Sequence, residues 1–226
     1  MPKMTARATE NAFFRILKNP PSLKSKVQRT EIPRVINGFK EGSKILNIGS
    51  KSTFYSRPVI NLDIVEYPDI DVKADAHHLP FGNNTLDGVI ITAVLEIVKY
   101  PNQVVSEISR VLKQGGFAIA TLPFLQPYHP DPTDCQRFTK EGVENLFFQF
   151  EKIKLCNTRG LFSMFFRIFR DFCAILFSFN NITLWKILNI VLGWLFFPFG
   201  AIDYILPEYK QLHFISSSFL YIGRKK

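Results

Sequence analysis

The feature that most constrains the fold of this chain is an alternation of short apolar runs with a helical pattern between residues 44 and 123. The apolar runs, which we expect to be strands, cover residues 44–48, 59–63, 71–74, 87–92 and 117–121. Short apolar runs of this length are typical of buried parallel strands. Strands that alternate with helices form mainly parallel sheets with right-handed crossovers, so the pattern predicts an α/β domain.

The helical part of the pattern is clearest in residues 102–112. Five apolar residues recur there at the spacing of one helix face: Val104, Val105, Ile108, Val111 and Leu112. Gly115-Gly116 follows and predicts the end of this helix before the fifth strand. Two later runs, residues 150–155 and 219–223, are expected to be the last two strands of the sheet.

Residues with binding chemistry follow the first two predicted strands. Gly49 and Ser50 open a loop in which the missing Cβ lets the backbone approach a ligand. Asp63 ends the second strand, where a carboxylate can accept two hydrogen bonds from a ribose diol. Taken alone, each feature is also typical of an ordinary turn. Together they predict a ligand site at the carboxyl ends of the strands.

Four segments carry a resemblance to a known family: KILNIGSKST, VINLDI, ADAHHLPFGNNTLDGVI and LEIVKYPNQVVSEISRVLKQGG. They resemble segments of the methyltransferase type 11 group of class I S-adenosylmethionine-dependent methyltransferases. The first two resemble that group's strand with a Gly-rich loop and its acidic strand end. The last two resemble its Asp-Ala and Leu-Pro-Phe run and its helix from Leu-Glu-His to Gly-Gly. The resemblance covers residues 44–123 directly and implies a Rossmann-like methyltransferase sheet, mostly parallel with an antiparallel last strand.

The resemblance implies S-adenosylmethionine as the cofactor. Gly49 and its neighbours should face the methionine part, Asp63 should hold the ribose hydroxyls, and Asp75 with Ala76 should meet the adenine edge. The full set of predicted cofactor-binding residues is Asn47, Gly49, Ser50, Asp63, Ile64, Asp75, Ala76 and Thr92.

This sequence departs from the group's pattern at several positions. The first loop has one glycine, Asn47 stands where Asp is usual, and Ile97 stands where His is usual. These departures keep a second hypothesis open, a catalytically degenerate methyltransferase-like scaffold anchored to a membrane.

The candidate catalytic residues lie in the loop after the fifth predicted strand. Histidine is a common general base, so His129 could act as one toward a hydroxyl, with Asp131 or Asp134 to orient or assist it. The alternative is a loop histidine with two turn-forming aspartates. Thr139 is expected to cap the helix that follows. No metal is expected, because the neighbouring His77 and His78 lack a third ligand.

Residues 158–212 form a Phe-rich apolar insertion between the last two predicted strands. Sixteen uncharged residues separate Lys186 from Asp203, fewer than the ~20 that a spanning helix needs. Two helices lying in one leaflet fit this pattern better, with Trp185 and Trp194 as interface anchors. The alternative is an apolar helical lid or a dimer contact.

The positive charge is concentrated near the N-terminus. The net charge is +9, and residues 1–44 hold ten Lys or Arg and three Glu. Such an arm suits anionic lipid or nucleic acid, or is a solvated tail. The three cysteines show no paired spacing, and the first residues lack the apolar core of a signal peptide, so we expect a cytoplasmic protein.

These observations predict three parts: a basic helical lead-in over residues 1–43, a Rossmann-like methyltransferase domain over 44–157 and 213–226, and a membrane-associated insertion over 158–212. The predicted function is O-methylation of a membrane-presented acceptor, such as a surface-glycan or lipid-linked sugar, at the inner face of the membrane. A nucleic-acid partner is not expected, because no Asn/Asp-Pro-Pro-aromatic motif follows the fourth strand. A nicotinamide oxidoreductase would need a fuller G-x-G-x-x-G. The oligomeric state stays open.

Overall fold

The computed structural model describes residues 26–51, 55, 59–129, 132–158, 160–205 and 209–226. The described chain divides into two compact units. Residues 26–160 and 209–226 form one, called here the sheet unit, and residues 161–205 form the other, the hairpin unit.

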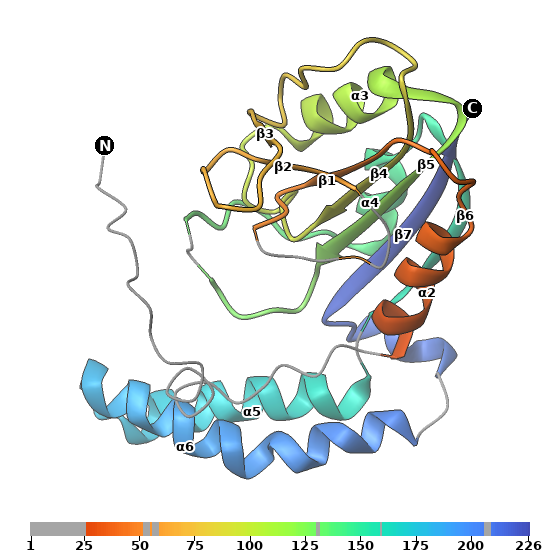
Figure 1. Cartoon of the computed structure of the whole chain (residues 1–226). Coiled ribbons are helices and arrows are strands. Elements are labelled where there is room, and N and C mark those ends of the chain that lie inside the picture. Colours follow the sequence, from red (N-terminus) through yellow and green to blue (C-terminus); the bar gives the residue numbers. More distant parts are fainter. Residues whose placement is uncertain (1–25, 52–54, 56–58, 130–131, 159, 206–208) are drawn as a thin grey trace. The chain divides into compact units, whose positions relative to one another are not determined.

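The sheet unit is built on a seven-stranded sheet (Figure 1). The strands are β1 (Ile45–Ile48), β2 (Ile60–Asp63), β3 (Val72–Lys73), β4 (Leu86–Thr92), β5 (Leu112–Pro123), β6 (Phe150–Asn157) and β7 (Ser218–Lys225). Their order across the sheet is β3-β2-β1-β4-β5-β7-β6. β1 to β5 run parallel, and β7 is antiparallel to both of its neighbours. The predicted Rossmann-like sheet with an antiparallel last strand is therefore confirmed.

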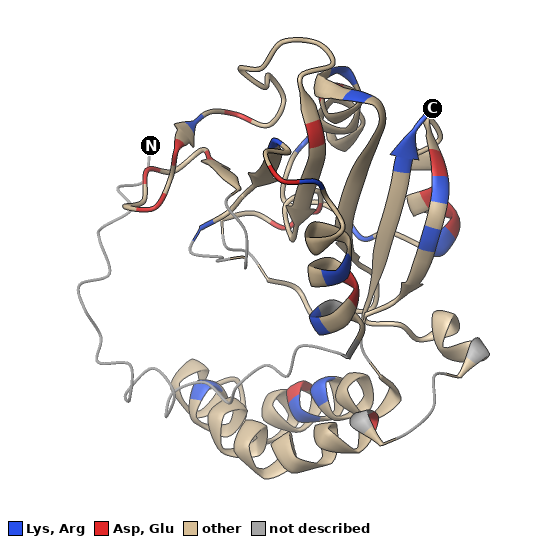
Figure 2. Ribbon diagram, turned by 45° about the vertical axis from the view of Figure 1, so that its right-hand side comes forward, with Lys and Arg blue, Asp and Glu red and all other residues tan. Residues whose placement is uncertain are grey.

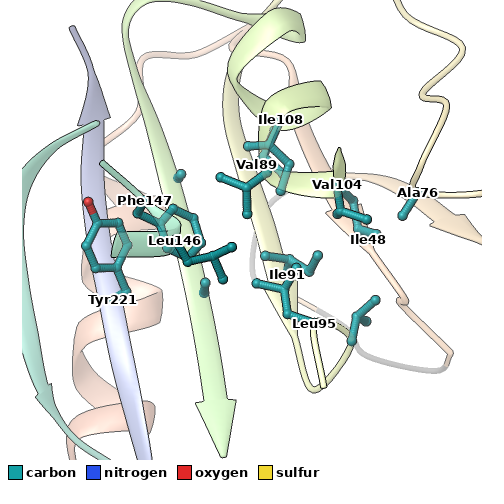
Figure 3. Close-up of a cluster of buried hydrophobic side chains, with 14 of the residues drawn as sticks. Ile48, Ala76, Val89, Ile91, Leu95, Val104, Ile108, Leu146, Phe147 and Tyr221 are labelled. Atoms are coloured by element: carbon teal, nitrogen blue, oxygen red, sulfur yellow. The ribbon is translucent and has the colours of Figure 1, made fainter. Parts of the chain in front are cut away.

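Helices cover both faces of this sheet. α3 (Pro101–Val111) and α4 (Lys140–Leu146) contribute to one buried cluster, which includes Leu46, Val89 and Ala118 of the central strands. Several members of this cluster are drawn in Figure 3. α2 (Lys26–Asn37) contributes to a second cluster with the intervening residues Ile45, Ile90 and Ile119. Because the central strands are buried on both faces, they have continuous apolar runs in the sequence.

Pro33 lies inside α2. Proline removes one backbone hydrogen bond and disfavours helix interiors. In α2, however, Ile32 and Ile36 are 7% and 0% exposed against the sheet. The burial of that apolar face outweighs the local preference of the proline.

The hairpin unit consists of α5 (Leu161–Phe177), α6 (Ile182–Gly200) and the 3-10 turn η1 (Ala201–Tyr204). Phe166 stacks on Phe199 and Phe169 contacts Phe196, with ring centroids 4.9 and 5.6 Å apart, so the helices are antiparallel. Asp203 accepts the backbone N–H groups of Phe162 and Ser163 at the start of α5. A second 3-10 turn, η2 (Lys210–Phe214), belongs to the sheet unit. The helical apolar insertion thus lies between β6 and β7 in the chain.

Candidate active site

The candidate site lies where the parallel strands end. β1, β2, β3 and β4 run in the same direction, so the residues that follow them gather at one edge of the sheet. Gly49 and Ser50 follow β1, Asp63 ends β2, and Thr92 ends β4. The topology therefore brings together most of the predicted cofactor-binding positions.

Gly49 makes a tight turn that only glycine adopts easily. Its φ is +68°, and its N–H donates to the carbonyl of Leu62 at 2.8 Å. A Cβ built on Gly49 would overlap Cγ2 of Val94 in the loop after β4. This glycine thus lets the loops after β1 and β4 approach each other.

Ser50 follows as a buried polar residue that lacks a partner. It is 2% exposed, and its Oγ makes no hydrogen bond with any described residue. A buried hydroxyl without a partner is costly, so its presence points to a group that the protein alone does not supply.

Asp63 is positioned by two backbone donors. Its Oδ2 accepts from the N–H of Lys51 at 3.1 Å and its Oδ1 from the N–H of Val65 at 3.0 Å. Each carboxylate oxygen has a second lone pair, so the side chain can still accept two hydroxyl groups. The next residue, Ile64, is 63% exposed and offers an apolar side chain beside this carboxylate.

Asp75 and His77 form a pair after β3. The Oδ1 of Asp75 accepts from the N–H of His77 at 2.9 Å and lies 2.7 Å from its Nδ1. Burial acts to raise the pKa of Asp75, but the hydrogen bonds and charge of His77, with the charge of His78, hold it below its usual value. The carboxyl is therefore ionised at neutral pH and can accept a hydrogen bond.

Two predicted cofactor residues are turned into the protein. Asn47 is 1% exposed inside β1, and its Nδ2 donates to Oδ1 of Asn61, its partner across the β1–β2 pair, at 3.1 Å. Ala76 is 7% exposed and packs in the core cluster that contains α3. Their positions support the strands and loops around the site, and direct cofactor contact by either stays a prediction.

The loop after β5 is held by an ion pair. Asp134 pairs with the guanidinium of Arg137, and its Oδ2 also accepts the backbone N–H of His129 at 2.8 Å. The Asp134 side chain is 4% exposed, and the Arg137 hydrogen bond holds its pKa below the usual range. His129 is exposed, and Asp134 contacts its backbone, not its imidazole. Asp131 lies outside the described residues.

This loop is docked onto the loop after β4. The carbonyl of Glu96 accepts from the N–H of Cys135 at 2.8 Å, and Nε2 of Gln136 donates to the carbonyls of Leu95 and Val98 at 3.0 Å each. Thr139 caps α4 by accepting the N–H of Gly142, as predicted.

Glu96 is a candidate functional residue that the sequence did not predict. Burial raises its pKa to about 7, the charge of Arg137 lowers it, and that of Asp134 raises it. Its Oε2 is buried and has no hydrogen-bond partner among the described residues. The sequence does place this acid directly after the apolar pair Val94-Leu95, in the loop that follows β4. That position could have indicated a partly buried carboxyl group.

The comparisons with known proteins agree with this architecture. Residues 53–120 match the family model described as "Methyltransferase domain", type 11. No curated protein matches the chain. A SAM-dependent methyltransferase from Archaeoglobus fulgidus has 15% identity and a TM-score of 0.55, over 96% of this chain and 100% of that one.

Two further solved structures show how widely this fold is used. The [4+2]-cyclase SpnF has 15% identity and a TM-score of 0.56, over 88% of this chain and 80% of that one. Phosphoethanolamine N-methyltransferase 2 of Haemonchus contortus, solved with phosphomonomethylethanolamine and S-adenosylhomocysteine, has 15% identity and a TM-score of 0.52, over 94% of this chain and 56% of that one. At these identities the likeness shows the fold alone.

Proposed function

We propose that this chain, whose residues 53–120 match the type 11 methyltransferase model, is an S-adenosylmethionine-dependent methyltransferase that O-methylates an acceptor presented at a membrane surface. The acceptor that we favour is a sugar hydroxyl of a surface glycan or of its lipid-linked precursor. We place the protein on the inner, cytoplasmic face of the membrane, where its three cysteines would stay reduced.

The residues at the strand ends fit S-adenosylmethionine. The Oγ of Ser50 is buried and has no hydrogen-bond partner among the described residues. Asp63 has lone pairs left for the ribose hydroxyls, and the ionised Asp75 can accept from the adenine amine. Ile64 supplies an exposed apolar surface beside the carboxylate.

Bound S-adenosylmethionine supplies an activated methyl group, which leaves the protein with alignment, exclusion of water and removal of a proton. We assign proton removal from the acceptor hydroxyl to His129, which lies in the loop after β5 and is exposed. Asp134 acts as a positioning residue, because it fixes the backbone of His129 and pairs with Arg137.

The single observation that carries the membrane assignment is the exposure of apolar side chains on the hairpin unit. Fifteen large hydrophobic residues from Leu161 to Phe199 are at least 36% exposed. Figure 2 shows few charged segments on α5 and α6. Single exposed hydrophobic residues are common on protein surfaces, but so many on one unit are typical of proteins that bind lipid or a partner.

A cofactor titration tests the enzymatic part. Calorimetry with S-adenosylmethionine should show binding that Asp63→Ala weakens at least about tenfold, which is ~1.4 kcal/mol. The matched control is Asp87→Ala, which removes a carboxylate with two hydrogen bonds, to Lys44 and Lys113, at the other end of β4. Unchanged affinity in Asp63→Ala would remove the ribose assignment. No binding to the unaltered protein at high micromolar ligand would favour the non-catalytic scaffold.

Transfer of a labelled methyl group tests the acceptor. Vesicles that carry a lipid-linked oligosaccharide should become labelled when they are incubated with the protein and labelled S-adenosylmethionine. The label should survive mild alkali, since an ether is stable where an ester is not. Label found in phospholipid or quinone fractions instead would reject the sugar hydroxyl.

A further inference from the structure

An exposed apolar stripe runs along α5. Its residues recur at the spacing of one helix face and are 40–65% exposed: Phe165, Ile168, Phe169, Phe172, Ile175 and Leu176. The charged residues of the same helix are less exposed. Arg170 and Asp171 form an ion pair at 2.6 Å, with side chains 25% and 19% exposed. A helix in water exposes its charged face, so this arrangement is the reverse of the one that water favours.

α6 has no comparable polar face. After Lys186 no charged residue follows until Asp203, and only 6% of the most apolar window of the helix is buried. By length and composition it is the one helix of the described residues that could cross a membrane. Its 19 residues span about 28 Å, close to the ~30 Å of a bilayer core.

Both ends of the hairpin unit connect to the same place in the sheet. Asn157 of β6 pairs with Phe219 of β7, and the N–H of Thr158 donates to the carbonyl of Ser218 at 2.9 Å. The segment between them therefore leaves and re-enters the sheet unit on one side of any membrane. If α6 crossed the bilayer, α5 would have to cross it too.

α5 cannot make that second crossing without carrying charges into the middle of the bilayer. Its 17 residues span about 26 Å, and Arg167, Arg170 and Asp171 lie near its centre. Charged side chains at the bilayer centre are costly. The pairing of Asn157 with Phe219 therefore excludes a single crossing of the bilayer. The charged residues of α5 disfavour two crossings, which leaves a hairpin that crosses no bilayer.

We propose that the α5–α6 hairpin is a monotopic anchor, which enters one leaflet through the exposed stripe of α5 and crosses no bilayer. Acyl chains are the occupant that fits, because the exposed surface is apolar on both helices. The proposal rests on the membrane part of the proposed function and is independent of methyl transfer.

Flotation with vesicles of phosphatidylethanolamine and phosphatidylglycerol tests the insertion. Phe172→Asp and Ile175→Asp should each reduce the vesicle-bound fraction about tenfold, because a charge replaces an apolar side chain that would lie among the acyl chains. Phe148→Asp is the matched control, since Phe148 is 67% exposed in the sheet unit, and it should float like the unaltered protein. Equal flotation of all variants would overturn the proposal. So would a dimer that forms without lipid in sedimentation experiments and that the Phe172→Asp and Ile175→Asp variants no longer form.

Labelling from the vesicle interior tests the absence of a crossing. In a chain with Cys135, Cys156 and Cys173 replaced by serine, Asn180→Cys places a thiol in the turn between the helices. A membrane-impermeant maleimide trapped inside the vesicles should leave this thiol unlabelled. Labelling from inside would show a two-span hairpin and overturn the proposal. The same variants should bind S-adenosylmethionine like the unaltered protein. A failure of the enzymatic assignment can then be distinguished from a failure of the membrane proposal.

Discussion

Gly49 and Val94 come from different loops, and the absence of a side chain on Gly49 makes room for Cγ2 of Val94. Gly49→Ala should therefore destabilise the protein by roughly 2–4 kcal/mol, from the left-handed backbone and from the overlap together. It should also weaken cofactor binding, because the loop after β1 must move. Chemical denaturation and calorimetry measure the two effects.

The control for this change is Gly42→Ala. Gly42 has φ +79°, but a Cβ there would meet nothing within 4 Å, so only the backbone cost of about 1 kcal/mol should remain. Adding Val94→Ala to Gly49→Ala removes the overlapping methyl group, and the double variant should be less unstable than the two single effects added. Strict additivity would mean that the contact is not the cause.

Asp75→Asn should change which purine the site accepts. The two contacts that Asp75 makes with His77 both use Oδ1, so Oδ2 is the atom assigned to the adenine amine. An asparagine amide can donate there instead, which suits a 6-oxo purine. We expect S-adenosylhomocysteine to bind about tenfold more weakly to Asp75→Asn, and its inosine analogue to bind more tightly than to the unaltered protein. If both ligands lose affinity equally, Asp75 has only a structural role.

Asp134→Asn should act on the loop and not on proton transfer. The substitution leaves Arg137 without its carboxylate partner, which for this partly buried pair costs about 1–2 kcal/mol. The pKa of Asp134 is lowered, so its contribution to stability is present at neutral pH and is lost as the pH falls through that lowered pKa. In kinetics, Asp134→Asn should raise KM and lower kcat moderately, whereas His129→Gln should lower kcat with little change in stability. The reverse pattern would make Asp134 the proton acceptor.

Glu96→Gln should alter how stability depends on pH. Because burial raises the pKa of Glu96 to about 7, the unfolded chain loses this proton at lower pH than the folded protein does. Stability therefore falls as the pH rises from about 4.5 to about 7, by an amount on the order of 3 kcal/mol. Glutamine removes this dependence, so the variant should gain stability relative to the unaltered protein across that range. Parallel curves of unfolding free energy against pH would refute the raised pKa.

The fold was predictable because its strands are local patterns. The buried runs of β1, β4 and β5 are apolar on both faces, and the antiparallel β7 follows from the resemblance to the methyltransferase group. α2 was less predictable, since Pro33 is a local signal and the burial of Ile36 depends on the sheet that it covers.

The site was predictable only where strand ends determine it. Gly49 and Asp63 follow from their place after β1 and β2, but the inward side chain of Asn47 depends on its partner Asn61. The setting of Glu96 arises because residues 133–137 fold over the loop after β4, a contact between distant segments that no local pattern encodes.

β7 lies between β5 and β6, yet it follows the hairpin unit along the chain. During translation both apolar helices are thus synthesised before the strand that joins β6 to the rest of the sheet. Until β7 has been added, β6 has no neighbouring strand in the sheet and β5 has none on that side.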